Sequence, residues 1–281
     1  MTETFTTADG LTLAYERRGE GALLVCHPGG PGFSSRLFAG DLGGLDRDFT
    51  LVLLDPRGTG ASEAPDDSAA YTTENYVADV DALREHLGEE QLNLLGHSHG
   101  GVVAAAYAAA HPQRVRRLVL ANSLARLLPA EMERIMQTRE AEPWYADARE
   151  ALEAESANAY STPEELAELT RRFWPMYFAR FDETARAYVS EHLVELSNSD
   201  ASTLFNAEIE ADEFDLRPLL DRVDAPTLVI TGEHDFICGP ACAADFSTIR
   251  GSRTVIVPDC GHFTFVETPD TWRETIRDFV A

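Results

Sequence analysis

The sequence predicts one α/β domain with a mostly parallel central sheet, flanked by helices and carrying an inserted helical cap. Short strand-like apolar runs alternate with helical stretches over residues 1–123, and this alternation returns over residues 223–281. Between these two parts, residues 124–222 contain no such runs and are rich in Ala, Glu, Leu and Arg, as helices are. We therefore expect residues 124–222 to form a cap on a core made of the other two parts.

The strands are predicted from short runs of β-branched residues and leucine. Continuous apolar runs are typical of parallel strands that are buried on both faces of a sheet. The predicted strands are 11–15, 22–26, 50–54, 91–95, 115–121, 226–231 and 253–257. Helices are expected at 73–87 and 272–280, and an alanine-rich helix is expected to follow residues 96–100 and to end near residue 111.

The charge of the chain limits the partners that it can bind. The formal net charge is −25 at pH 7, and so acidic a protein repels phosphate backbones and anionic lipid surfaces. We expect most of the carboxylates to be solvating surface groups, and we expect neither nucleic acid nor a membrane as a partner. All the basic residues are arginine, which excludes Schiff-base, pyridoxal phosphate and P-loop lysine chemistry.

The four cysteines do not form a disulfide framework for a chain of this size. They contain no CxxC pattern and are not part of a closely spaced quartet of cysteines and histidines, so we predict small buried residues and no metal site. These cysteines are Cys26, Cys238, Cys242 and Cys260. The first ten residues lack the basic and apolar regions of a signal peptide, and no run of about 18 apolar residues occurs. We therefore expect a cytoplasmic protein.

A nucleophile elbow is the most informative motif in the sequence. Gly96-His97-Ser98-His99-Gly100 fits the pattern G-x-S-x-G, and it follows a predicted buried strand and opens a predicted helix, as this motif requires. The serine of such a motif lies on a sharp, strained turn, and the flanking glycines let the neighbouring backbone pass. The helix N-terminus behind Ser98 favours developing negative charge. We therefore predict Ser98 as the nucleophile.

A serine hydroxyl needs a general base, and the base needs an acid that holds it in one tautomer. In chains with this elbow, the acid and then the histidine follow in loops after later strands. Asp235 follows the predicted strand 226–231 and is the expected acid, with Glu233 as the alternative. His262 follows the predicted strand 253–257, and no other histidine has this place in the topology, so we predict it as the base.

Two backbone N–H groups are expected to stabilise the oxyanion that forms when the nucleophile attacks. One is expected from His99, the residue after the nucleophile. The other is expected from the glycine-rich loop 27–32, after the strand 22–26, where we predict Gly30 as the donor. Glycines permit the close backbone approach that such a donor requires.

Together these motifs resemble those of the proline iminopeptidase family, whose members have the α/β-hydrolase fold. The resemblance spans the core and is most specific in GGPG at residues 29–32 and in DPRGTG at residues 55–60 with Ser62. The elbow, GEHD at residues 232–235 and GH at residues 261–262 complete it. The resemblance implies an enzyme that removes N-terminal residues, often proline, from peptides or amino acid amides without a metal or cofactor. The implied partner is a small molecule or short peptide with a free amine.

The resemblance also implies carboxylates that hold the ammonium group of the substrate. A glutamate often follows the catalytic aspartate in the family, whereas Phe236 follows Asp235 here, and Pro28 stands where the family usually has histidine. A second glutamate, in the cap, has the same role in the family. The nearest match in this sequence is Glu208, with Glu195 and Glu210 as rivals.

Despite these departures we expect the chemistry of a hydrolase, but they do not determine which substrate it cleaves. One interpretation is removal of an aminoacyl group from a larger hydrophobic molecule such as a polyketide intermediate, with the aromatic segment 173–181 lining the site. The same segment is equally compatible with packing between cap and core. The same machinery also cleaves esters, lactones or carbon–carbon bonds, and a non-catalytic small-molecule receptor is the alternative from another functional class.

Overall fold

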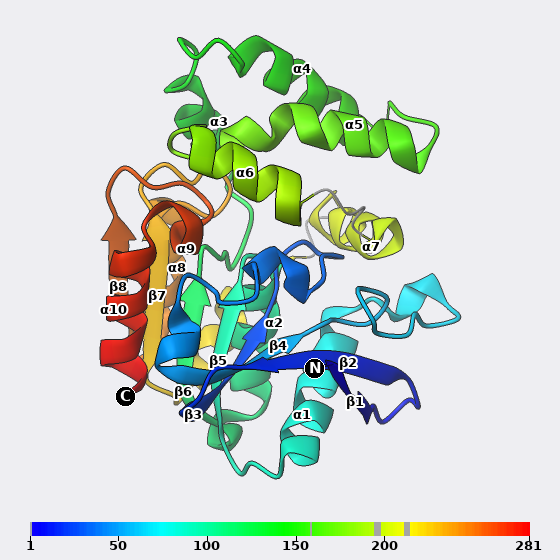
Figure 1. The fold of residues 1–281 in the computed structure, drawn as a ribbon, viewed down its shortest axis with the longest axis vertical. Coiled ribbons are helices and arrows are strands. Elements are labelled where there is room, and N and C mark those ends of the chain that lie inside the picture. The colour runs from blue at the N-terminus through cyan, green and yellow to red at the C-terminus, as the bar shows by residue number, and fades with distance from the viewer. Residues whose placement is uncertain (1, 158, 194–197, 211–213) are drawn as a thin grey trace.

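The computed structural model describes residues 2–157, 159–193, 198–210 and 214–281. An eight-stranded sheet crosses the molecule in the order β1-β2-β4-β3-β5-β6-β7-β8 (Figure 1). Its strands are β1 (Thr2–Thr6), β2 (Thr12–Arg18), β3 (Ala22–His27), β4 (Phe49–Leu54), β5 (Leu92–His97), β6 (Val115–Ala121), β7 (Thr227–Gly232) and β8 (Arg253–Val257). The pairs β1–β2 and β2–β4 are antiparallel and all the others are parallel, which confirms the predicted mostly parallel sheet.

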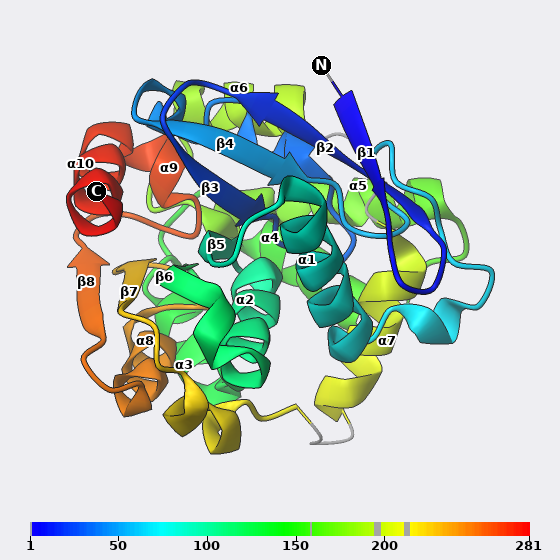
Figure 2. The ribbon, with the colours of Figure 1, turned by 90° about the horizontal axis from the view of Figure 1, so that it is seen from below.

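Both faces of the central sheet are buried because successive residues of its strands are apolar. In β3, Val25 belongs to one hydrophobic cluster, whereas Leu24 and Cys26 belong to the cluster on the opposite face. Helices cover both clusters (Figure 2). On one face lie α1 (Thr73–Leu87), α2 (His99–Ala110) and α8 (Pro240–Asp245), and on the other lie α9 (Thr264–Glu267) and α10 (Pro269–Val280). None of the helices in the described part of the chain combines the length and the apolar composition that crossing a membrane requires.

The edge strand β1 was not predicted from the sequence. Its residues are mostly threonine, and Phe5 is the residue of this strand that is buried. The neighbouring β2 extends to Arg18, beyond the predicted end at residue 15, and its last two residues are exposed. Strand β1 was difficult to predict because an edge strand buries few side chains and therefore needs few apolar residues. The other predicted strands agree with the structure within two residues at each end.

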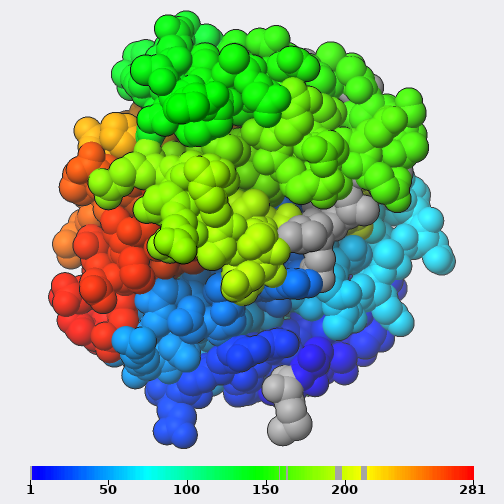
Figure 3. All heavy atoms as spheres, turned by 45° about the horizontal axis from the view of Figure 1, so that its top comes forward, coloured from blue at the N-terminus to red at the C-terminus, as the bar shows by residue number. Residues whose placement is uncertain are grey.

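The segment between β6 and β7 is helical, as predicted, and most of it lies over the carboxyl ends of the parallel strands (Figure 1). Seen from that side, it spreads over much of the core (Figure 3). Its helices are α3 (Pro129–Gln137), α4 (Tyr145–Ser156), α5 (Pro163–Phe173), α6 (Glu183–His192) and α7 (Ser199–Glu210). A 3₁₀ helix at Arg217–Arg222 ends the segment and packs against α2, with Leu220 buried in the core. The final residues of the predicted cap therefore contact the core directly.

The aromatic segment 173–181 attaches the cap to the core. Trp174 and Phe178 belong to the hydrophobic cluster that also contains residues of α10, and the rings of Phe178 and Phe263 are 5.1 Å apart. Phe173 belongs instead to a cluster formed mainly by cap residues, and Tyr177 packs against both clusters. Of the two interpretations of this segment, packing between cap and core therefore describes Trp174 and Phe178.

Candidate active site

Ser98 lies between β5 and α2 in a backbone conformation that residues with side chains rarely adopt. Its φ is 54° and its ψ is −123°, which is the strained turn expected of a nucleophile elbow. The N–H of Ser98 donates to the carbonyl of Ala121 at 2.9 Å, and the hydroxyl of Ser123 donates to the carbonyl of Ser98 at 2.8 Å. A Cβ at Gly100 would lie 2.2 Å from the carbonyl oxygen of His27, so a glycine is needed there. The main-chain N–H and carbonyl of the strained serine are thus both held by hydrogen bonds.

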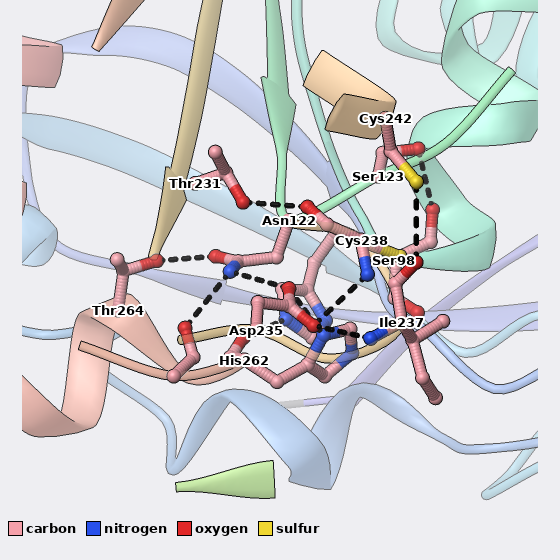
Figure 4. A network of polar contacts seen from close by, with 12 residues as sticks. Ser98, Asn122, Ser123, Thr231, Asp235, Ile237, Cys238, Cys242, His262 and Thr264 are labelled. Atoms are coloured by element: carbon pink, nitrogen blue, oxygen red, sulfur yellow. Dashed lines mark hydrogen bonds and ion pairs between the residues drawn. The ribbon is translucent and has the colours of Figure 1, made fainter. Parts of the chain in front are cut away.

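The predicted acid and base form a buried hydrogen bond near Ser98 (Figure 4). The distance from Nδ1 of His262 to Oδ2 of Asp235 is 2.8 Å, and both side chains are almost completely inaccessible to solvent. The other carboxylate oxygen of Asp235 accepts the N–H groups of Ile237 at 3.1 Å and Cys238 at 2.9 Å. The alternative acid, Glu233, is exposed and accepts a hydrogen bond from the N–H of Asp259. The structure therefore pairs His262 with Asp235 and leaves Glu233 outside this pair.

The environment of Asp235 keeps its carboxylate ionised. Burial by itself would raise the pKa of Asp235. The charge of His262, its hydrogen bond and the neighbouring amide donors outweigh burial, so the pKa of Asp235 is lowered below its ordinary value. An ionised Asp235 holds the proton of His262 on Nδ1 and leaves Nε2 able to accept a proton.

Asn122 is a supporting residue that was not predicted from the sequence. Its side-chain amide donates to Oδ2 of Asp235 at 2.9 Å and to the carbonyl of Gly261 at 3.1 Å. Its amide oxygen accepts the hydroxyl of Thr264 at 2.5 Å. Asn122 therefore connects the loop of the acid with the loop of the base. The available signal was its position, since it is the first polar residue after the apolar strand β6, where site residues of a parallel sheet gather.

His97, next to the nucleophile, is a second supporting residue. Its Nε2 donates to the main-chain carbonyl of His262 at 3.0 Å, and the two imidazole rings are 4.8 Å apart. Burial, together with the charge of His262, lowers the pKa of His97 to about 3. His97 therefore stays neutral at ordinary pH and acts as a hydrogen-bond donor that holds the backbone of His262, with no role as a base.

The two predicted oxyanion donors lie on neighbouring segments. His99 is the first residue of α2, and Gly30 lies in the loop after β3 that passes close to Gly100. Within the part of the chain that the structure describes, neither N–H is engaged in a hydrogen bond. Free donors at these positions are compatible with an oxyanion hole, and the role of Gly30 and His99 stays a prediction.

Two of the three predicted amine-binding glutamates, Glu208 and Glu210, lie on α7 of the cap. Glu208 is half-buried on α7, the last α-helix before β7. Glu210 is the last residue of the same helix. Glu195 lies outside the described residues.

A cysteine lies beside the candidate triad. Potential ligand atoms of Asp235, Cys238 and His262 lie within 4.8 Å of one another, the one such group among the described residues. Burial, with the charge of Asp235, raises the pKa of the Cys238 thiol well above its ordinary value. Metals bind the thiolate form of cysteine, and Asp235 and His262 already use their facing atoms on each other. This donor set therefore does not fit a resident metal ion. All four cysteines are buried and free, which confirms their prediction as small buried residues.

Glu267, at the end of α9, bridges the loop of the predicted base and the cap. Its two carboxylate oxygens accept the N–H of Gly261 at 2.8 Å and the N–H of Ala179 at 2.7 Å. Burial raises the pKa of Glu267 to about 7 although the amide donors oppose this rise, and the charge of Asp235 adds to it. The folded protein therefore binds this proton more tightly than the unfolded chain does.

Glu267 is expected to make stability depend on pH. The stability due to its proton is fully present below its ordinary pKa of 4.5 and is lost as the pH rises through about 7. Relative to Glu267→Gln, the unfolding free energy of the wild type is expected to fall between about pH 5 and pH 7, by at most about 1.4 kcal/mol per pH unit. Urea unfolding at several pH values measures this. Glu274→Gln, an exposed glutamate on α10, is the control and is expected to follow the wild type. Identical pH slopes for Glu267→Gln and the wild type would contradict the prediction.

Comparisons with known proteins agree with this fold. The family model described as alpha/beta hydrolase fold matches residues 22–269. A proline iminopeptidase of Lactobacillus crispatus is 28% identical over 94% of this chain and 92% of its own length, and a mouse protein named serine hydrolase BPHL is 29% identical over 100% and 87%. The crystal structure of the enol-lactonase from Burkholderia xenovorans LB400 is 26% identical with a TM-score of 0.73, covering 99% of both chains.

The resemblance to proline iminopeptidases that the motifs indicated is therefore supported along nearly the whole chain. The similarity to a lactonase of the same fold means that fold alone does not fix the substrate. The chain belongs to the alpha/beta hydrolase fold family and is a serine hydrolase.

Proposed function

We propose that this hydrolase cleaves the amide bond after an N-terminal aminoacyl group, through an acyl-enzyme on Ser98. The observation that carries the proposal is the buried 2.8 Å hydrogen bond between His262 and Asp235, next to a serine held at a φ of 54°. A base fixed in one tautomer beside a serine on a strained turn is the arrangement that activates a hydroxyl for attack on a carbonyl.

The reaction follows from the roles of these groups. The hydroxyl of Ser98 attacks the carbonyl carbon of the substrate while Nε2 of His262 takes its proton. The N–H groups of Gly30 and His99 stabilise the oxyanion, and the protonated His262 then gives its proton to the leaving amine. A water molecule, deprotonated by His262, attacks the acyl-enzyme, and its collapse restores Ser98 and releases the amino acid. Asp235 stabilises the imidazolium at both stages.

The aminoacyl preference rests on the similarity to proline iminopeptidases, and one departure shapes the expected substrate. Phe236, the residue after the acid, is buried, and its ring lies 5.1 Å from that of Tyr177. This position therefore offers an apolar ring where an ammonium group would need a carboxylate. Glu208 on α7 is the proposed partner of the amine, with Glu195 and Glu210 as rivals. The rings of Tyr177 and Phe263 each lie 5.3 Å from the ring of His262. These rings favour a substrate with hydrophobic bulk, such as an aminoacylated polyketide intermediate.

Ester or lactone hydrolysis is the second candidate. The likeness to an enol-lactonase at 26% identity favours it, because the same nucleophile, base and oxyanion donors cleave esters. The receptor alternative loses its basis, since the chain is a serine hydrolase by family. Carbon–carbon bond cleavage has no specific observation in its favour.

A substrate panel separates the two candidates. Initial rates are measured on aminoacyl anilides, on their N-acetylated counterparts and on simple acyl esters, with Ser98→Ala as the blank. We expect the free-amine anilides to react and acetylation to abolish their turnover, because the free ammonium group is needed for binding. Activity on esters alone would overturn the aminoacyl proposal in favour of an esterase or lactonase. A Ser98→Ala enzyme with most of the activity would overturn the catalytic assignment itself.

A further inference from the structure

We propose that Asn198, the cap residue immediately before α7, is a positioning residue for the oxyanion hole. It holds the loop that carries Gly30, and so acts on the reaction through the backbone of that loop. The inference rests on the proposed function, because it assigns Asn198 a role in placing an oxyanion donor.

The cap is hydrogen-bonded to the oxyanion loop directly after the predicted donor. The N–H of Asn198 donates to the carbonyl of Gly32 at 2.8 Å. One helical turn later, the hydroxyl of Ser202 donates to the carbonyl of Pro31 at 2.9 Å. These two carbonyls belong to the two residues that follow Gly30. The path of the loop beside Gly30 is therefore set by α7, a helix about 170 residues further along the chain.

The side-chain amide of Asn198 is hydrogen-bonded at both its nitrogen and its oxygen, which fixes the residue in place beside Gly32. Its amide nitrogen donates to the carbonyl of Gly58 at 3.0 Å and to the hydroxyl of Tyr71 at 2.8 Å. Its amide oxygen accepts the N–H groups of Asp200 at 3.1 Å and Ala201 at 3.2 Å, which caps the N-terminus of α7. A side chain with both a donor and an acceptor is needed, because one end binds the core and the other binds the helix.

Two glycines of the sequence motifs leave the space that Asn198 occupies. A Cβ at Gly32 would lie 2.5 Å from the main-chain oxygen of Asn198, and a Cβ at Gly58 would lie 2.4 Å from its side-chain nitrogen. Both glycines also have a positive φ, of 95° and 71°. The last glycine of GGPG and the first of DPRGTG are thus required by the same residue of the cap.

The same helix also reaches the other predicted donor. The ring of Phe205, on α7, lies 4.8 Å from the ring of His99. Burial lowers the pKa of His99 to about 3, so its ring stays neutral and packs as an aromatic group. Phe205 of α7 therefore contacts one predicted donor residue directly, whereas Asn198 and Ser202 bind the two residues that follow the other, Gly30.

The experiment compares Asn198→Ala with Asn206→Ala, an exposed asparagine on the same helix. For each variant, kcat and KM are measured on the best panel substrate, together with the inhibition constant of an aryl boronic acid. Ser98 adds to the boron, and an oxygen of the tetrahedral adduct occupies the oxyanion hole. We expect Asn198→Ala to lower kcat and boronate affinity about 10-fold each, with KM within about two-fold, since a small displacement of a donor is costly. Asn206→Ala is expected to match the wild type.

Three outcomes decide the matter. Asn198→Ala with the kcat and boronate affinity of Asn206→Ala overturns the inference. If Asn198→Ala does not fold, Ser202→Ala decides, because it removes a single hydroxyl, which donates to the carbonyls of Pro31 and Asn198. A fall of about three-fold in kcat and in boronate affinity supports the inference, and no fall overturns it. Activity in Ser98→Ala contradicts the proposed function, whereas an inactive Ser98→Ala beside an unaffected Asn198→Ala contradicts the positioning role alone.

Discussion

Replacing Asp235 with asparagine is expected to lower kcat by roughly 10⁴-fold while the protein stays folded. The asparagine amide would donate to Nδ1 of His262 and force its proton onto Nε2, where it blocks proton transfer from Ser98. The binding of substrate is expected to change little, because Asp235 is buried behind His262. Single-turnover kinetics on the best substrate of the panel, with circular dichroism as the test of folding, measures this effect.

Asp259→Asn is the matched control for this prediction. Asp259 lies in the loop after β8, as Asp235 lies in the loop after β7, but its side chain is exposed. Its backbone φ is 49°, a conformation that asparagine adopts readily, so the control introduces little strain. We expect the kcat of Asp259→Asn to match the wild type. More than about a tenth of the wild-type rate in Asp235→Asn would exclude this carboxylate as the orienting acid.

Replacing Arg57 with alanine is expected to lower the unfolding free energy by about 3–5 kcal/mol. Its guanidinium forms two hydrogen bonds with the carboxylate of Asp79, at 2.8 Å and 2.6 Å, and both side chains are almost fully buried. The variant leaves the charge of Asp79 buried without its partner, and this accounts for most of the loss. Urea unfolding of the variant and the wild type measures it.

Two further variants separate this explanation from a loss of packing. Arg57→Met combined with Asp79→Leu removes both charges and keeps most of the volume, so it is expected to recover most of the stability lost in Arg57→Ala. Arg171→Ala removes an exposed ion pair with Glu168 and is expected to have little effect. A double variant no more stable than Arg57→Ala would show that the charge left on Asp79 is not the cause.

The positions of Ser98, Asp235 and His262 could be predicted because each depends on local sequence and on strand order. The elbow has its own pattern, and the other two residues follow strands that are apolar enough to be recognised. The sequence alone distinguished the acid Asp235 from the alternative Glu233 only in part, because they lie two residues apart in the same loop. The structure distinguishes them by burial, since Asp235 is buried and Glu233 is exposed. The roles of the three residues in the reaction stay predictions until the substrate panel is measured.

Asn122, Glu267 and Asn198 could not be predicted, because each acts on residues that are distant in the sequence or in another layer. Asn122 contacts Asp235 across 113 positions, and Asn198 contacts Gly58 across 140. Apart from the position of Asn122 directly after an apolar strand, no local pattern distinguishes these side chains from ordinary turn or helix-end residues. The aromatic segment 173–181 was ambiguous for a similar reason, since its apolar character does not tell whether a ring packs on the core or faces a ligand.

The cap is joined to the core at both sides of the reaction centre. On one side, the N–H of His262 donates to the carbonyl of Tyr177 at 2.7 Å, and Glu267 binds the N–H of Ala179. On the other, Asn198 binds Gly32. A cap that swung open as one body would break all three hydrogen bonds and release the loops of the base and of the oxyanion donor together. Opening of the cap and the chemical step would thus depend on the same hydrogen bonds, so a variant with a looser cap that admits bulkier substrates is expected also to slow the acylation step.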